Sequence, residues 1–150
     1  MFTIDAIMTT NVVTIPPSAS LADARELMHE HRIHHVPVVN EDGGLAGLVT
    51  LTDVLAASDS SLRNQDSRIR ASDITLAEAM VTDVATVSSA ASLRQAALFI
   101  EKHKIGCLPV VDDGKLTGII TDSDFVAVAI NLLEQLEEGE PDDFDEAEIA

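Results

Sequence analysis

The sequence predicts an α/β fold of the mixed α+β kind, in which two pseudo-symmetric β-α-β-β-α units pack face to face through their sheets. The main observation is an internal repeat, since a shift of 72 residues places Met80 on Met8 and Pro109 on Pro37. Within each copy, short apolar runs alternate with segments of helical spacing. A unit of about sixty residues has too little core to stand alone, so the two units are expected to pack together.

The first half of each unit is predicted from an apolar run and a cap residue. A short strand is expected first, at "VVTI" in one copy and "VATV" in the other. A helix follows, with Ser20 or Ser92 as its N-cap and Asp23 or Gln95 three residues later to complete the cap.

The second half of each unit is predicted to be a β-hairpin followed by a helix. The hairpin strands are "HVPVVN" with "LAGLVT" in the first copy, and "LPVVDD" with "KLTGIIT" in the second. The offset falls to 71 after the turn, because the first turn is one residue longer. The helices are expected to start at Thr52 and Ser123.

The chain is expected to divide into four parts. Residues 1–59 form the first unit, and residues 74–138 form the second, which ends in an extended helix. The polar, Ser-rich stretch 60–73 links them. Residues 139–150 are expected to be disordered, because Glu134 to Glu148 includes nine acidic residues and no basic one.

Charge and apolar patterning exclude several classes of partner. A net charge of −17 with nine Lys and Arg argues against nucleic-acid binding, which needs clustered basic side chains. The N-terminus lacks the basic segment of a signal peptide, and "FVAVAINLL" is too short to span a bilayer, so a cytoplasmic protein without membrane contact is expected. Cys107 lies in an apolar run and is expected to be a buried thiol.

One heptapeptide occurs in both copies, as "GLVTLTD" at residues 47–53 and "GIITDSD" at residues 118–124. On a structural interpretation, the glycine lets a strand run close to a neighbouring backbone, and the aspartate favours the dipole of the following helix. On a ligand interpretation, the carboxylate accepts ribose hydroxyls, while the threonine and the helix N–H groups bind a phosphate. The residues alone leave both interpretations open.

Together with "HRIHHVPVV" and "HKIGCLPVV" before the hairpins, these heptapeptides make the chain resemble a tandem pair of CBS domains, often called a Bateman module. The resemblance covers residues 4 to about 133. It implies that adenosine-containing ligands bind at the heptapeptides. Asp53 and Asp124 would then hold the ribose and Thr50 and Thr121 would face the phosphate, while the base would lie near Thr14, Val36, Thr86 and Leu108.

Basic side chains near the two helix ends provide further candidates. The cluster His29, His31, His34 and His35 could be a surface feature, a metal or anion sensor, or, together with His103, a set of phosphate contacts. Arg32 and Lys104 occupy equivalent positions and could neutralise phosphate charge.

The two sites are not expected to be equal, because His34 and His35 in the first copy correspond to Gly106 and Cys107 in the second. Gly106 leaves room and a backbone N–H. We therefore expect Thr121 and Asp124, grouped with Gly106, to form the better adenosine site.

These observations predict a non-catalytic regulatory module, since the sequence has no nucleophile elbow, Walker loop or credible Cys–His pair. The expected ligand is AMP, ADP, ATP or a related adenosyl compound, with no other cofactor and no metal. The expected partners are a second copy of the chain, because "FVAVAINLL" is apolar nearly all round, and a separate, unidentified protein target. The alternatives are a ligand-free dimerisation module and, more weakly, the histidine-based metal or anion sensor.

Overall fold

The computed structural model describes residues 1–63 and 70–138. The acidic tail, residues 139–150, and the central part of the predicted linker lie outside the described residues. The first half of the chain contributes η1 (Ile4–Ala6), α1 (Leu21–His31), β1 (His35–Val39), β2 (Leu45–Thr50) and α2 (Leu51–Arg63). The second half contributes η2 (Ala71–Asp73), α3 (Leu76–Ala79), α4 (Leu93–His103), β3 (Cys107–Asp112), β4 (Lys115–Thr121) and α5 (Asp122–Leu136).

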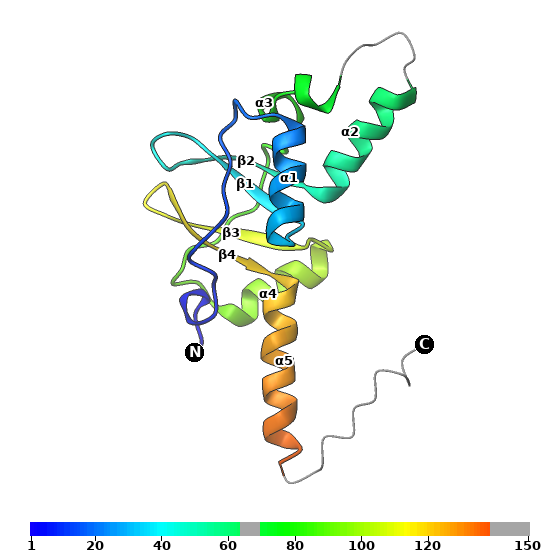
Figure 1. The fold of residues 1–150 in the computed structure, drawn as a ribbon. Helices are drawn as coiled ribbons and strands as arrows, with labels where there is room; N and C mark the ends of the chain where they lie inside the picture. The colour runs from blue at the N-terminus through cyan, green and yellow to red at the C-terminus, as the bar shows by residue number, and fades with distance from the viewer. Residues whose placement is uncertain (64–69, 139–150) are drawn as a thin grey trace, which may run out of the picture.

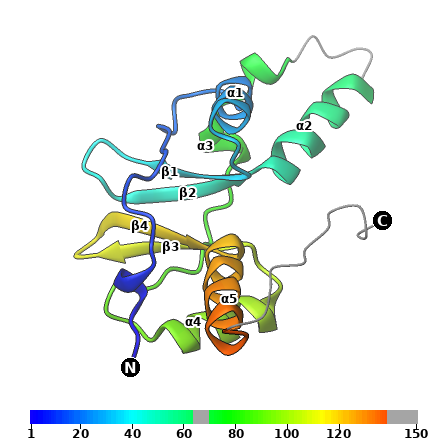
Figure 2. The same ribbon diagram turned by 60° about the horizontal axis from the view of Figure 1, so that its bottom comes forward.

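Both predicted hairpins are present. Strands β1 and β2 pair antiparallel, as do β3 and β4, and each pair ends with a threonine opposite the first residue of the hairpin: Thr50 opposite His35 and Thr121 opposite Cys107. The two hairpins face each other between the helices, with α1, α2 and α3 on one side and α4 and α5 on the other (Figures 1 and 2). At the turns, the Leu116 N–H donates to the Gly43 carbonyl at 3.0 Å. The predicted face-to-face packing is therefore confirmed.

The strands predicted at residues 12–15 and 84–87 are wrong as regular strands. Each forms a single parallel bridge, Ile15 with Val38 and Val87 with Val110. In the first unit, the Ile15 N–H donates to the Pro37 carbonyl at 3.1 Å, and the Val39 N–H donates to Ile15 at 2.9 Å. Proline has no N–H, so Pro37 cannot extend this ladder toward the N-terminus of the segment.

Ser20 and Ser92 cap the first helices as predicted, and the complete capping box is present at α1. At the start of α1, Ser20 and Asp23 exchange both bonds of a capping box, at 3.1 and 3.0 Å. At α4, Ser92 accepts the Gln95 N–H at 3.2 Å. Each of these helices buries its predicted face, with Leu21, Ala24 and Met28 in one core and Ala96 and Ile100 in the other.

Short segments cross over between the two cores. Ile4 of η1 is fully buried in the core of the second unit, while Leu76 of α3 is fully buried in the core of the first. The backbone continues the exchange, since Thr9 pairs with Ile119 of β4 and Val81 pairs with Leu48 of β2. The predicted boundaries along the chain stay a prediction, but in space each core includes a piece from the start of the other unit.

The glycine of each heptapeptide makes this exchange possible. A Cβ atom on Gly47 would lie 2.7 Å from the Val81 carbonyl oxygen, and one on Gly118 would lie 2.9 Å from the Thr9 carbonyl oxygen. Any side chain would push the crossing segment off the strand. The expected close approach to a neighbouring backbone is confirmed at both positions.

Candidate ligand clefts

The Thr-x-x-Asp part of each heptapeptide closes a strand onto a helix. The Thr50 N–H donates to Asp53 Oδ2 at 3.2 Å, and the Asp53 N–H donates to Thr50 Oγ1 at 3.2 Å. In the second unit, Asp124 Oδ2 accepts from the Thr121 N–H at 2.8 Å and from the Thr121 hydroxyl at 3.3 Å. The structural interpretation of the heptapeptide is therefore confirmed as local geometry.

The cap prediction for these helices needs a correction. Thr52 and Ser123 lie inside α2 and α5, and the residues before the helices are Thr50 and Thr121. A threonine followed three residues later by an acidic residue is the sequence pattern of a capping box, and this signal was available in the sequence. Each carboxylate uses Oδ2 for the cap, so Oδ1 lies outside the capping bonds.

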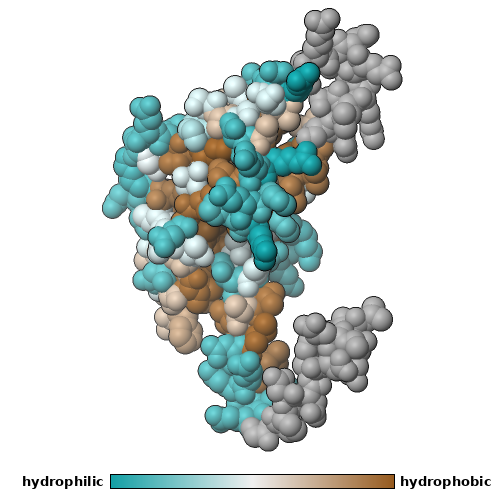
Figure 3. All heavy atoms as spheres, in the orientation of Figure 1, coloured by the Kyte–Doolittle hydropathy of each residue, from teal (hydrophilic) through white to brown (hydrophobic). Residues whose placement is uncertain are grey.

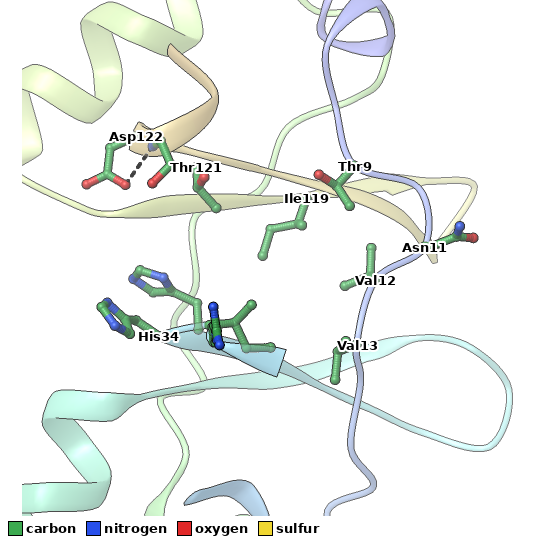
Figure 4. Close-up of a pocket in the computed structure, with 12 residues that line it drawn as sticks. Thr9, Asn11, Val12, Val13, His34, Ile119, Thr121 and Asp122 are labelled. Atoms are coloured by element: carbon green, nitrogen blue, oxygen red, sulfur yellow. Dashed lines mark hydrogen bonds between the residues drawn. The ribbon is translucent and has the colours of Figure 1, made fainter. Parts of the chain in front are cut away.

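The first cleft lies at the start of α5 and has a volume of about 340 Å³. Thr121, Asp122 and Ser123 form one wall, and His34 lies across the cleft from them (Figure 4). Val12 and Val13 approach from the chain segment before α1, next to Ile119 of β4 (Figure 4). Residues of both units therefore build this cleft.

The second cleft lies at the start of α2 and has a volume of about 380 Å³. The repeat relates its lining to that of the first cleft: Thr50 corresponds to Thr121, and Gly106 corresponds to His34. The chain segment 83–85 takes the place of residues 11–13. The two clefts are thus pseudo-symmetric copies, each closed by the threonine of one unit and the helix-end loop of the other.

This arrangement overturns the predicted grouping of site residues. The sequence suggested that Gly106 would share a site with Thr121, and that His34 would share one with Thr50. The structure instead places His34 with Thr121 and Gly106 with Thr50. The reason is the face-to-face packing, which turns each helix-end loop toward the opposite unit. A Cβ atom on Gly106 would lie 2.6 Å from His35 Nε2, across the interface.

The other predicted residues lie at varied depths. Val36 and Leu108 are fully buried in the two cores, so a bound base could reach only their backbone. His103 lines the second cleft, with its ring centroid 4.2 Å from that of Phe99. Thr14 and Lys104 are exposed outside both clefts, and Thr86 lines a separate hollow beside the first hairpin turn.

Sequence reasoning missed the segment before each first helix as part of the clefts. Asn11 and Asp83, at equivalent positions of the repeat, line the first and second cleft respectively. Asp122 was missed as well, although it lies inside the second heptapeptide. Asn11 and Asp83 each lie three residues after a repeated methionine, Met8 or Met80, so the internal repeat was the signal that could have drawn attention to them.

His35 lines both clefts and is the wall that they share. Burial lowers the pKa of its imidazole; the nearby Asp122 carboxylate acts in the opposite direction, and His34 lowers the pKa further. Its counterpart in the repeat, Cys107, is buried as predicted, and burial together with Asp122 raises the pKa of the thiol to about 12. The thiol is therefore protonated at neutral pH.

The histidine cluster crosses the end of α1 as the sequence predicted. His29 and His31 belong to the last turn of the helix, Arg32 caps it in a left-handed conformation, and His34 and His35 follow. Across residues 1–63 and 70–138, no three His, Cys, Asp or Glu side chains come together in a way that could hold a metal ion. Among the same residues, no helix is long and apolar enough to cross a membrane.

Comparison with known proteins decides the family. The family model of the CBS domain matches residues 4–60 and again residues 71–131. The chain belongs to the CBS-domain family. It contains the domain twice, so it is a tandem CBS pair, as the resemblance of the two heptapeptides implied.

Curated relatives of this CBS pair include short and long proteins. The CBS domain-containing protein YhcV of Bacillus subtilis is 31% identical over 117 residues, which are 78% of each chain. The homoserine O-acetyltransferase of Methanocorpusculum labreanum is 38% identical over 120 residues, but these are only 22% of that enzyme. The chain thus spans about a fifth of the enzymes that it matches, and the match is to their CBS part.

Solved structures of CBS pairs resemble the whole fold. A putative acetoin utilization protein (AcuB) from Vibrio cholerae is 45% identical with a TM-score of 0.79, covering 94% of this chain and 99% of its own. CBSX2 in complex with AMP is 31% identical with a TM-score of 0.76, covering 89% and 99%. The CBS pair of MJ0100, in complex with 5′-methylthioadenosine and S-adenosyl-L-methionine, is 26% identical with a TM-score of 0.74, covering 88% and 98%.

Proposed function

We propose that this CBS pair is a non-catalytic regulatory module that binds AMP, ADP, ATP or a related adenosyl compound in at least one of its two clefts. The observation that carries the proposal is the repeated cleft itself. Each cleft begins at a helix start where a threonine lies in the wall. The cap aspartate three residues later is not itself among the lining residues, but it is bonded to that threonine through Oδ2, and in our proposal its Oδ1 accepts a further hydrogen bond from the ligand.

The dimensions and chemistry of the clefts support this proposal. Volumes of about 340 and 380 Å³ fall within the range of small-molecule sites. A carboxylate beside a helix start can accept ribose hydroxyls, while the helix N-terminus favours negative charge. The related pairs solved with AMP, and with 5′-methylthioadenosine and S-adenosyl-L-methionine, make adenosyl compounds the first ligands to test.

The repeat also supports a holding role for the two aspartates. Asp53 and Asp124 make corresponding cap bonds in corresponding places. An acid–base pair needs two groups whose surroundings push their pKa values apart, and symmetry works against such a difference. In our proposal, a separate protein target in the cytoplasm responds to the ligand-bound form of this module.

The test is a thermal shift assay with AMP, ADP, ATP, NAD and S-adenosylmethionine. A ligand of the folded state stabilises it by mass action, by about 2.7 kcal/mol at a concentration one hundred times its dissociation constant. Isothermal titration calorimetry of each stabilising compound then gives the stoichiometry. If none of the five raises the melting midpoint at millimolar concentration, the proposal is wrong.

One observation favours a second candidate, a ligand-free assembly module. Helix α5 projects from the body of the protein (Figure 1) and carries exposed apolar side chains, with Val126 57% and Ile130 52% exposed. Such a surface is typical of an interface. A chain that dimerises but binds none of the adenosyl compounds would support this candidate.

A further inference from the structure

We infer that the two clefts select different classes of adenosyl ligand. The first cleft takes adenosine 5′-phosphates, and the second takes adenosyl compounds whose 5′ substituent is uncharged or cationic. The inference rests on the proposed function, because it assumes that adenosine binds. The inference goes beyond the proposed function, because it states which ligand charge each cleft prefers. The internal repeat allows this, since it gives each residue of one cleft an equivalent position in the other.

The cationic side chains of the helix-end loops are distributed unequally. Arg32 and Lys104 occupy equivalent left-handed cap positions, with φ of 54° and 53°. Arg32 lines the first cleft, whereas Lys104 lies outside the lining of the second. A guanidinium in the wall can bind a phosphate through two parallel hydrogen bonds. Among the residues that the structure describes, only the first cleft has a guanidinium in its wall.

The next position of the loops adds to the difference. His34 lies across the first cleft from Thr121 and Asp122 (Figure 4), so its imidazole can donate a hydrogen bond to an anion held between the walls. The equivalent residue of the second cleft is Gly106, which has no side chain to donate. The second cleft does have His103, but its ring packs against Phe99.

Each cleft has one carboxylate in its lining, so the difference depends on the cation beside it. In the second cleft this carboxylate is Asp83. The equivalent residue in the first cleft is the neutral Asn11, which lies at the far end of that cleft from Asp122 (Figure 4). The first cleft also contains an acid, Asp122, whose Oδ1 accepts the Ser123 N–H at 2.9 Å. There, however, Arg32 offsets the charge of Asp122, whereas the described residues that line the second cleft include no Arg or Lys to offset Asp83.

The walls of the second cleft suit an uncharged ligand group. Leu48, Val84, Phe99 and Ile105 line it, together with the protonated thiol of Cys107. A phosphate dianion would lose water against these apolar groups without gaining an Arg or Lys partner among the described lining residues. A thioether or a sulfonium would keep favourable apolar or charge contacts, the latter with Asp83.

Calorimetric titrations with AMP, adenosine and S-adenosylmethionine test the inference. The variant Arg32→Gln removes the cation of the first cleft, and Lys104→Gln is its matched control, because it removes the same charge at the equivalent position. We expect Arg32→Gln to weaken AMP binding about tenfold and to change adenosine binding by less than about twofold. Lys104→Gln is expected to change neither by more than about twofold.

The variant Asp83→Asn tests the second cleft. We expect it to strengthen AMP binding at the weaker site and to weaken S-adenosylmethionine binding about fivefold, since it removes one unit of negative charge from the wall. Glu41→Gln, at the first hairpin turn outside both clefts, is the control, because it removes the same unit of negative charge away from the ligand.

Several results would overturn the inference. One is an equal loss of AMP and adenosine binding in Arg32→Gln, and another is an equal effect of Lys104→Gln on AMP. A third is direct competition between AMP and S-adenosylmethionine for one cleft of the unaltered protein. If neither these three compounds nor ADP, ATP and NAD bind the unaltered protein, the proposed function fails; if adenosyl compounds bind without this charge preference, only the further inference fails.

Discussion

The carboxylates of Asp53 and Asp124 serve the fold, and in the proposed function each keeps one oxygen for a ligand. Each accepts the N–H of the threonine before its helix through Oδ2. Oδ1 is not used for the cap, and both residues are half-buried, each bonded to a threonine that lines a cleft, although neither aspartate is itself in a lining. A substitution at either position therefore acts on stability and on binding together, and the two effects have to be measured separately.

Replacing Asp124 by alanine is predicted to weaken AMP binding about ten- to hundredfold, because a charged acceptor for the ribose hydroxyls is lost. The same change removes half of a capping box and is expected to lower the free energy of unfolding by about 1 kcal/mol. Calorimetry gives the first quantity and urea unfolding the second. Asp53→Ala is the matched variant of the second cleft and should affect AMP less. Unchanged AMP binding in both variants would contradict the ligand interpretation of the heptapeptide.

His35, between the clefts, makes stability depend on pH. Burial lowers its pKa below the ordinary value of 6.5, so the unfolded chain binds the proton more readily than the folded one. Its contribution to the free energy of unfolding is complete above pH 6.5 and is lost as the pH falls below that value. Urea unfolding should show that the free energy of unfolding falls less between pH 7.5 and pH 5.5 in His35→Gln than in the unaltered protein. An unchanged slope would contradict this, and His29→Gln, on the exposed end of α1, is the control.

At the scale of elements, the heptapeptide glycines determine how segments cross between the two units. Gly118 lies where Met8 and Thr9 cross strand β4, and Gly47 lies where Met80 and Val81 cross β2. The crossing segments contribute Ile4 and Leu76 to the opposite cores. Loss of either crossing would therefore disturb a core as well as a strand edge.

Gly118→Ala is predicted to lower the free energy of unfolding by about 1–3 kcal/mol. Its new Cβ atom would lie 2.8 Å from Met8 Sδ and 2.9 Å from the Thr9 carbonyl oxygen, and the carbonyl belongs to backbone that cannot turn aside. Gly44→Ala is the control, because its Cβ atom would meet the Asp42 side chain at 3.1 Å, which can move. Urea unfolding of the two variants checks the prediction, and equal stabilities would show that the crossing segment yields easily.

At the scale of the whole molecule, the most conspicuous unexplained feature is the apolar face of α5. Val126, Ile130 and Leu133 follow one another at helical spacing and are 57%, 52% and 52% exposed. Apolar surface along this helix is visible where it leaves the body of the protein (Figure 3). A helix with this pattern normally has a partner.

We predict that the chain forms a homodimer through α5. One chain has a mass of 16.0 kDa, and light scattering at micromolar concentration should give twice that value. The variant Ile130→Lys should reduce the measured mass to that of a monomer. Asn131→Lys, at the adjacent exposed position, adds the same charge beside the apolar face and should leave the dimer intact. A monomer mass for the unaltered protein would contradict the prediction.

Much of the local structure could be read from the sequence, because it depends on residues close together in the chain. The repeat located both hairpins, Ser20 and Ser92 as caps required only their near neighbours, and the heptapeptide glycines indicated a close approach. The same local signal was missed at Thr50 and Thr121, where the Thr-x-x-Asp pattern predicts a capping box. The prediction of a regular strand at residues 12–15 was wrong because this segment lies beside Pro37, which has no N–H for a further ladder bond. Which strand lies beside the segment is decided by the tertiary structure.

By itself, the sequence determined that there are two copies of one α/β unit, and which threonine and aspartate stand at each helix start. Only the tertiary structure decided which side chains share a cleft. His34 faces Thr121 and Gly106 shares a cleft with Thr50 because the units meet face to face, so each helix-end loop completes the cleft of the other unit. A repeat fixes what each copy contains, but contacts between copies depend on how their surfaces pack, and no spacing within one copy encodes that.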